Sequence, residues 1–266
     1  MTDKKTDTKK ERSKVKTFPV PIPFEEIKGN IIPSTSNSNQ FYKINIINKA
    51  LNLQSKGNIK EAIKYYDLII KEGYKDYRVF FNYAIILKNQ GRLVEARNLL
   101  KKVIKTNPDH YQAHHTLGNI LRQFGEYEDA EKKIRKAIKI KFNYAEAHNS
   151  LGNILQDLGK SKEAEISIRK AIKYSPKASI PYSNLGNILK GYGKISQAFN
   201  YYLKAIKCDE TISFNYVLIT QLLRDEDLSD IKKKDIKDII NILLRRNDIA
   251  HKYLFNAFNS LYEKDL

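Results

Sequence analysis

The sequence predicts an all-α protein built as a solenoid of stacked helix-turn-helix units. Three observations carry this prediction. The pentapeptide Leu-Gly-Asn-Ile-Leu begins at Leu117, Leu151 and Leu185, so successive copies are 34 residues apart. When the chain is written in 34-residue blocks from Lys43, small and apolar residues recur at the same block positions, and a glycine recurs near the middle of five blocks. Self-similarity at such a period is typical of repeat architectures.

Each block predicts a helical hairpin. Block positions 4, 7, 8 and 11 are apolar or small, as are positions 20, 24 and 27, and both spacings place these residues on one helical face. Helices of about a dozen residues are marginal alone, so stacking of neighbouring blocks must supply the stability. The blocks begin at Lys43, Tyr77, Tyr111, Ala145, Ser179 and Ser213. Position 15, between the two helices, is occupied by Gly57, Gly91, Gly125, Gly159 and Gly193.

The glycine of the repeated pentapeptide stands at block position 8, inside the first predicted helix. Glycine costs about 1 kcal/mol relative to alanine in a helix interior. Its recurrence as Gly118, Gly152 and Gly186 therefore indicates a compensating contact. We expect close approach to the second helix of the hairpin near the small residues of position 20, Ala130, Ala164 and Ala198.

Composition divides the chain into three parts. Residues 1–40 combine a basic, charged tail with a segment rich in proline, serine and asparagine, which predicts a disordered tail and an extended linker. Residues 41–230 hold five full repeats and a degenerate sixth. Residues 231–266 contain two apolar periodic segments, 236–244 and 250–261, which we predict to be helices that cap the end of the stack, with Asp248 as a candidate N-cap.

The composition of the chain points away from enzymes and membrane spans. One cysteine, Cys208, excludes an internal disulfide framework and fits a reducing compartment. The first sixteen residues lack the apolar run of a signal peptide, so we predict a cytoplasmic protein. We find no phosphate loop, dinucleotide fingerprint or nucleophile elbow, and no zinc spacing. We therefore predict no catalysis, no cofactor and no metal, and we assign His114 and His148, at position 4, to packing.

The blocks resemble the tetratricopeptide repeat. The resemblance implies a right-handed superhelix whose first helices line a concave groove, where ligands usually bind. It also implies a scaffold or adaptor for protein-protein interaction. In the third block the residues that match are His114, Leu117, Gly118, Leu121, Gly125, Tyr127, Ala130, Ile134 and Ala137, with histidine where the family has tryptophan.

Block positions 2, 5, 6, 9, 12 and 13 share the face of the first helix that packing leaves over, and the resemblance places this face in the groove. Carboxamides offer one acceptor and two donors, so they can pair with the backbone of an extended peptide. The segment 182–187 is similar to the asparagine-lined array of O-linked N-acetylglucosamine transferase. Alternatively, these polar residues are solvated or bridge neighbouring repeats. The predicted peptide-binding residues are Asn48, Asn82, His115, Asn119, Arg122, Asn149, Asn153, Asn184, Asn187 and Lys190.

Other polar residues complete the predicted groove. Thr116, Ser150 and Ser183 fall at positions 5 or 6 and are expected to line it. Glu146 is the one acid that we place there, so the basic rim described next favours a somewhat acidic partner. A basic rim is predicted from Arg78, Lys88, Arg122, Lys190 and Arg224.

Two other functions stay open. Bacterial arrays of this family often precede a glycosyl- or sulfotransferase domain, so the chain could recruit substrates for such an enzyme. Net charge is +18, and a basic stripe along the second helices could attract nucleic acid or anionic lipid. We favour a solvated lysine face over this role, because exposed lysine is common. Oligomeric state and partner identity are not assigned. The stripe consists of Lys102, Lys105, Lys136, Lys139, Lys170, Lys173, Lys204 and Lys207.

Overall fold

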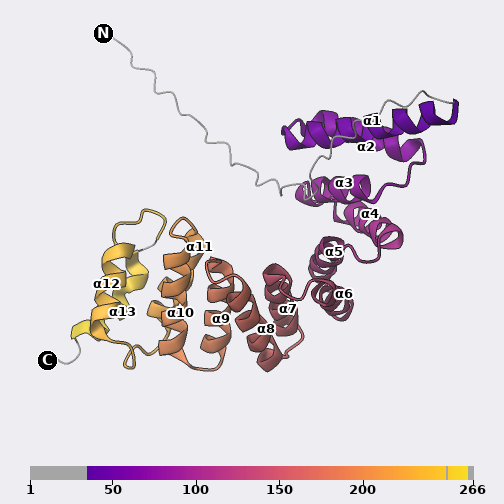
Figure 1. Cartoon of the computed structure of the whole chain (residues 1–266). Helices are drawn as coiled ribbons and strands as arrows, with labels where there is room; N and C mark the ends of the chain where they lie inside the picture. Colours follow the sequence, from indigo (N-terminus) through magenta and orange to yellow (C-terminus); the bar gives the residue numbers. More distant parts are fainter. Residues whose placement is uncertain (1–34, 250, 263–266) are drawn as a thin grey trace, which may run out of the picture.

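The computed structural model describes residues 35–249 and 251–262, and these residues fold into a curved stack of helical hairpins (Figure 1). The predicted all-α solenoid is therefore confirmed. From the second block to the sixth, the first helix begins at the residue that opens the block. The helices are α1 (Thr35–Ser55), α2 (Ile59–Lys71), α3 (Tyr77–Asn89), α4 (Leu93–Thr106), α5 (Tyr111–Gln123), α6 (Tyr127–Ile140), α7 (Ala145–Asp157), α8 (Ser161–Tyr174), α9 (Ser179–Gly191), α10 (Ile195–Cys208), α11 (Ser213–Asp225), α12 (Lys233–Leu243) and α13 (Phe255–Tyr262).

The position-15 glycines end the first helix of each of the five hairpins. Gly125 has a φ of +77°, a left-handed conformation that glycine adopts without steric cost. Its N–H donates to the Arg122 carbonyl at 3.0 Å, and the Glu126 N–H donates to the Leu121 carbonyl at 3.0 Å, which closes a Schellman-type turn. The backbone can then reverse within a few residues, so the second helix packs back on the first.

The position-8 glycines lie where the two helices of a hairpin touch, as predicted. A Cβ built on Gly118 would stand 2.7 Å from the Ile134 side chain and 3.2 Å from the Ala130 carbonyl oxygen. A Cβ on Gly186 would overlap the Tyr202 ring. The nearest neighbours are thus the large side chains of position 24 rather than the alanines of position 20. The missing Cβ makes room for them.

One hydrophobic core runs through the whole stack, from Ile46 in α1 to Ala257 in α13. Each second helix contacts the first helix of the next hairpin, so every repeat is covered by its neighbours. This arrangement explains how helices of 13 or 14 residues are stable without a globular core. It also leaves one face of each first helix and one face of each second helix free of the core.

The two ends of the stack differ from the predicted boundaries. At the N-terminal end α1 begins at Thr35, inside the segment predicted as linker, whereas residues 1–34 of the predicted tail and linker lie outside the described residues. At the C-terminal end a 3₁₀ turn, His251–Leu254, precedes α13, and both contact α11. Asp248 is therefore not the N-cap of α13, which begins at Phe255; its carboxylate is paired with Arg246 at 2.6 Å.

None of the described helices combines the length and the apolar character that a membrane crossing requires.

Candidate functional site

We call the side chains at block positions 2, 5, 6, 9, 12 and 13 of the first helices the polar face. All ten predicted peptide-binding residues lie on it, and each is half-buried rather than fully exposed or fully buried. They come from the first five hairpins, on α1, α3, α5, α7 and α9. The structure therefore places them along one row of helices, and the side-chain hydrogen bonds among them join residues of the same helix or of the next first helix.

His115 is the centre of the densest cluster on this face, at the junction of α5 and α7. Asn119 Nδ2 donates to His115 Nε2 at 3.1 Å, and Ser150 Oγ lies 3.0 Å from the same nitrogen. On the other side of the ring, Nδ1 lies 3.0 Å from the Tyr144 hydroxyl oxygen. A neutral imidazole with its proton on Nδ1 fits these contacts, because Nδ1 then donates to the Tyr144 hydroxyl and the single lone pair of Nε2 is shared between Asn119 and Ser150.

The surroundings of His115 keep it in this neutral form. Burial and, to a smaller extent, the positive charge of Lys88 together lower the pKa of His115 to about 4. Burial also raises the pKa of the neighbouring Tyr144 hydroxyl. The cluster is consequently uncharged near neutral pH and presents hydrogen-bonding groups rather than charge.

Contacts between neighbouring repeats follow a fixed offset. Asn184 Nδ2 donates to Asn149 Oδ1 at 2.9 Å, and the two residues are 35 positions apart, as are His115 and Ser150. Position 5 of one repeat thus meets position 6 of the next. The predicted alternative, in which polar residues bridge neighbouring repeats, therefore describes part of this face correctly.

Of the remaining carboxamides, some form hydrogen bonds within the described residues and some do not. Asn187 Oδ1 accepts from the Tyr202 hydroxyl at 2.7 Å, and burial raises the pKa of Tyr202 to about 12, so this hydroxyl keeps its proton. Asn82 donates to the Arg78 carbonyl at 2.8 Å. Asn48 and Asn153, in contrast, make no side-chain hydrogen bond to another described residue. Among the described residues, nothing uses their donors and acceptors.

The expectation that Thr116 and Ser183 line the groove is wrong. Thr116 is 7% exposed and Ser183 is 2% exposed, so neither reaches a ligand on the polar face. Ser183 Oγ donates to Asn215 Oδ1 at 2.6 Å, and Asn215 Nδ2 donates to Ser179 Oγ at 2.7 Å. Asn215 was missed by the sequence analysis because it stands at block position 3, outside the helical spacing assigned to the groove.

The predicted basic rim is largely paired within the chain. Arg122 forms an ion pair with Asp157, and Lys190 forms one with Glu226 at 3.3 Å. Arg78 and Arg224 pair with Asp76 and Asp225 respectively. Lys88 is the rim cation that makes no ion pair with a described residue. The expectation that Glu146 is the one acid of the groove is also wrong, because Asp157 lies on the same face. Asp157 stands at block position 13, so its position in the repeat could have identified it.

Histidines at position 4 pack as predicted. His114 and His148 are 4% and 5% exposed, and the Nε2 atoms lie 2.9 and 2.8 Å from the carbonyl oxygens of Pro108 and Phe142. His110 is the N-cap of α5, where its Nδ1 accepts from the Ala113 N–H at 3.1 Å. These three rings fix the loops that precede the first helices. The eight stripe lysines, on the second helices, are all exposed.

An all-α solenoid of helical hairpins with a half-buried polar face defines a repeat protein. Two family models of the tetratricopeptide repeat match this chain, over residues 87–154 and 145–177. The hairpins within residues 87–177 therefore match the tetratricopeptide repeat. None of the curated proteins compared with the chain matches it.

Solved structures share the fold at low sequence identity. PilF of Pseudomonas aeruginosa is 12% identical with a TM-score of 0.64, over 86% of this chain and 100% of that chain. MamA from Desulfovibrio magneticus RS-1 is 19% identical with a TM-score of 0.57, over 64% and 96%. YrrB, described as a TPR protein with an unusual peptide-binding site, is 16% identical with a TM-score of 0.53, over 76% and 98%.

Proposed function

We propose that this chain is a non-catalytic scaffold or adaptor that binds an extended peptide segment of a partner protein on its polar face. Proteins of the tetratricopeptide-repeat family bind protein or peptide partners, and YrrB, a structural neighbour, is described as having a peptide-binding site. The observation that carries the proposal is the unused hydrogen-bonding capacity around Asn149, Asn153 and Asn184.

These three carboxamides offer both donors and acceptors. Asn149 uses its oxygen to accept from Asn184, so the two N–H groups of Asn149 and the oxygen of Asn184 are left for a ligand. Asn153, one helical turn along α7, contributes a whole carboxamide that no described residue pairs with. An extended backbone presents C=O and N–H groups whatever its side chains, so this set suits a partner selected by conformation more than by charge.

The internal pairing of the rim changes the expected partner. Four of the five rim cations are already balanced by carboxylates of the chain, which leaves Lys88 as the source of a local positive charge. A strongly acidic partner is therefore not required. A neutral or weakly acidic peptide fits the polar face better than the sequence alone suggested.

Affinity capture from cell extract tests this proposal. We compare the wild type with a variant carrying Asn149→Ala, Asn153→Ala and Asn184→Ala, at two salt concentrations. Because both members of the Asn149–Asn184 pair are removed together, the variant leaves no orphaned hydrogen-bonding group and should fold. A control variant, Lys105→Gln with Lys173→Gln, removes two exposed charges of the stripe.

A partner that is lost with the asparagines, survives high salt and is kept by the lysine control supports the proposal. A folded asparagine variant that retains every partner contradicts it. Cooperation with a glycosyl- or sulfotransferase, binding of nucleic acid or anionic lipid by the stripe and a cytoplasmic location stay predictions of the sequence. Cooperation with a transferase would be supported if such an enzyme co-purified with the wild-type chain and not with the asparagine variant.

A further inference from the structure

The fourth repeat departs from its neighbours at two adjacent positions of its second helix. Block position 22 is Ile166, which is 59% exposed, although the other four full repeats have lysine or asparagine there. Position 23 is Ser167, although the others have tyrosine, leucine or lysine. Stacking explains neither change, because an exposed isoleucine adds nothing to the core and a serine fills less space than its equivalents.

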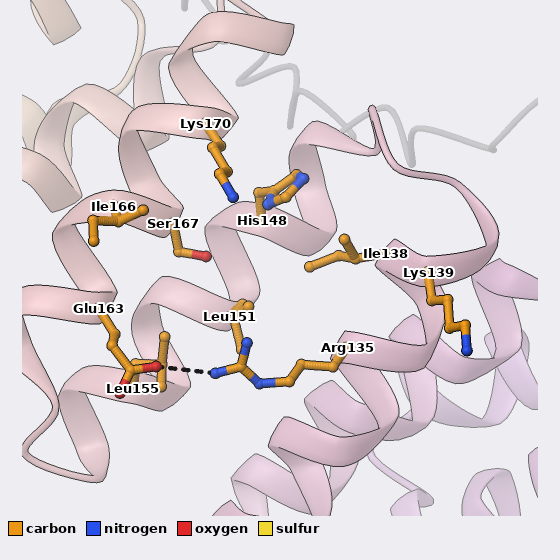
Figure 2. Close-up of a pocket in the computed structure, with 10 residues that line it drawn as sticks. All are labelled: Arg135, Ile138, Lys139, His148, Leu151, Leu155, Glu163, Ile166, Ser167 and Lys170. Atoms are coloured by element: carbon orange, nitrogen blue, oxygen red, sulfur yellow. Dashed lines mark hydrogen bonds and ion pairs between the residues drawn. The ribbon is translucent and has the colours of Figure 1, made fainter.

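Both residues line one cavity. Its volume is about 350 Å³, and it lies between α6 and α8 above α7. Ile138, Leu151 and Leu155 provide an apolar lining, and the exposed Ile166 extends it. Figure 2 shows Ile166 and Ile138 on opposite sides of the cavity, with Ser167 between them. A large apolar side chain placed here would bury apolar surface against this lining, which is favourable.

Positive charge surrounds this apolar lining. Arg135, Lys139 and Lys170 line the cavity, and Glu163 is the one carboxylate among the lining residues. Glu163 accepts from Arg135 at 3.1 Å, the pair drawn at one end of the cavity in Figure 2, with Lys170 at the other end. Lys139 and Lys170 are exposed and make no ion pair with a described residue. Their charges are therefore available to a ligand.

An equivalent cavity two repeats earlier lacks this combination of an exposed apolar residue and unpaired lysines. Between α2, α3 and α4 a cavity of about 370 Å³ is lined by Asp67, Arg92 and Glu95. Arg92 binds Glu95 through two 2.7 Å hydrogen bonds, so its charge is neutralised. At positions 22 and 23 this cavity has Asn98 and Leu99. It combines neither an exposed apolar wall nor an uncompensated positive charge.

We propose that the cavity between α6 and α8 is a second docking site, for a segment of a partner protein that carries a large apolar side chain flanked by aspartate or glutamate. The apolar side chain enters between Ile138 and Ile166, and the carboxylates lie against Lys139 and Lys170. Charge complementarity selects the acidic flanks, and the apolar lining selects the central side chain. Two of the eight stripe lysines thereby acquire a role that the other six do not share.

Selection from a library of random twelve-residue peptides displayed on phage tests this site on the full chain. Enriched peptides are synthesised with a fluorescein label, and their affinities are measured by fluorescence polarisation. We expect peptides with a large apolar residue next to acidic residues. The double variant Ile166→Asn with Ser167→Leu introduces the residues that the second repeat has at these two positions, Asn98 and Leu99, so it should keep the fold. It should weaken binding at least tenfold.

Charge variants and controls separate this site from the others. Lys139→Gln with Lys170→Gln should weaken the same peptides several-fold and reduce the salt dependence of their binding. Lys105→Gln with Lys173→Gln should leave the affinity unchanged, as should the polar-face variant Asn149→Ala, Asn153→Ala, Asn184→Ala. This last control makes failure here distinct from failure of the proposed function.

Three outcomes overturn the inference. One is that the enriched peptides lack the acidic and apolar character. Another is that their affinity survives Ile166→Asn with Ser167→Leu in a variant whose circular dichroism matches the wild type. The third is that no peptide depends on the cavity whereas co-sedimentation with phosphatidylserine vesicles is lost in Lys139→Gln with Lys170→Gln. That result would assign the two lysines to a membrane surface.

Discussion

The first helices carry two kinds of contact that differ in how they hold the array. Toward the second helix of the same hairpin, Gly186 meets the ring of Tyr202 so closely that no Cβ fits. Toward the next repeat, on the polar face, half-buried side chains such as Asn149 and Asn184 share single hydrogen bonds. Water cannot replace a close-packed contact between side chains, whereas it can replace one partner of a half-buried hydrogen bond. The hairpin is thus the rigid unit, and the polar face of the junction is adjustable.

The largest effect is expected from Gly186→Val. A branched side chain there overlaps the Tyr202 ring, which is 1% exposed and cannot move outward. Overpacking of this kind costs about 1–3 kcal/mol or more, and we expect the free energy of unfolding, measured by urea denaturation, to fall by about 3 kcal/mol.

Gly191→Ala is the matched control on the same helix. Gly191 is the last residue of α9, and no atom lies within 4 Å of the Cβ that it would gain. Alanine is the better helix former by up to about 1 kcal/mol, so this variant should be neutral or slightly more stable. A loss of stability as large as that of Gly186→Val would show that α9 tolerates no substitution at all, and would remove the argument from close packing.

The packing face could be predicted from sequence because its cause is local. Glycine at position 8 of a helix has few explanations other than close approach, and a 34-residue recurrence repeats that information. The polar face could be predicted only as a set of positions. Whether Asn149 faces water, a ligand or Asn184 depends on the rotation between repeats, which residue types do not encode. Ser183 shows the consequence, because a serine at a groove position became buried once Asn215 stood opposite.

Asn215→Ala tests whether a buried polar junction behaves like the packing face. Asn215 is 1% exposed and bonds Ser179 and Ser183; without it Ser183 loses its partner, whereas Ser179 keeps its hydrogen bond to the Ala205 carbonyl. Orphaned buried groups cost about 1–3 kcal/mol, so we expect a loss of about 2 kcal/mol in urea denaturation. A half-buried counterpart, Asn184→Ala, should cost less than about 1 kcal/mol. Equal costs for the two variants would contradict the distinction between buried and half-buried junctions.

Acid should weaken the junction at His115. Its pKa is about 4 in the folded protein and about 6.5 in the unfolded chain, so the unfolded state binds more protons as the pH falls through this window. Stability is retained above pH 6.5 and falls as the pH approaches 4. From pH 7 to pH 5 the loss attributable to His115 is about 2 kcal/mol. Lys88 adds to this effect, whereas Asn119, Tyr144 and Ser150 hold the neutral ring.

His115→Asn isolates this contribution, because asparagine is the residue at the same position of the next repeat. The burial of His110, His114 and His148 also lowers their pKa values, so the wild type and the variant should both lose stability in acid. The variant should lose less, by about 2 kcal/mol, in urea denaturation at pH 7 and pH 5. Identical pH dependence in the two proteins would mean that the His115 ring is readily protonated in the folded state.

The smallest effect is expected at the rim, where Arg122 and Asp157 join neighbouring repeats by an ion pair that is open to solvent. Pairs of this kind contribute about 0–1 kcal/mol, because water and salt screen them. A double-mutant cycle with Arg122→Gln and Asp157→Asn should give a coupling energy below about 1 kcal/mol that shrinks further in high salt. A coupling energy of several kcal/mol would mean that the rim ion pair stabilises the array as strongly as the packing contacts do. The junction would then be as rigid on its polar face as the hairpin is at Gly186.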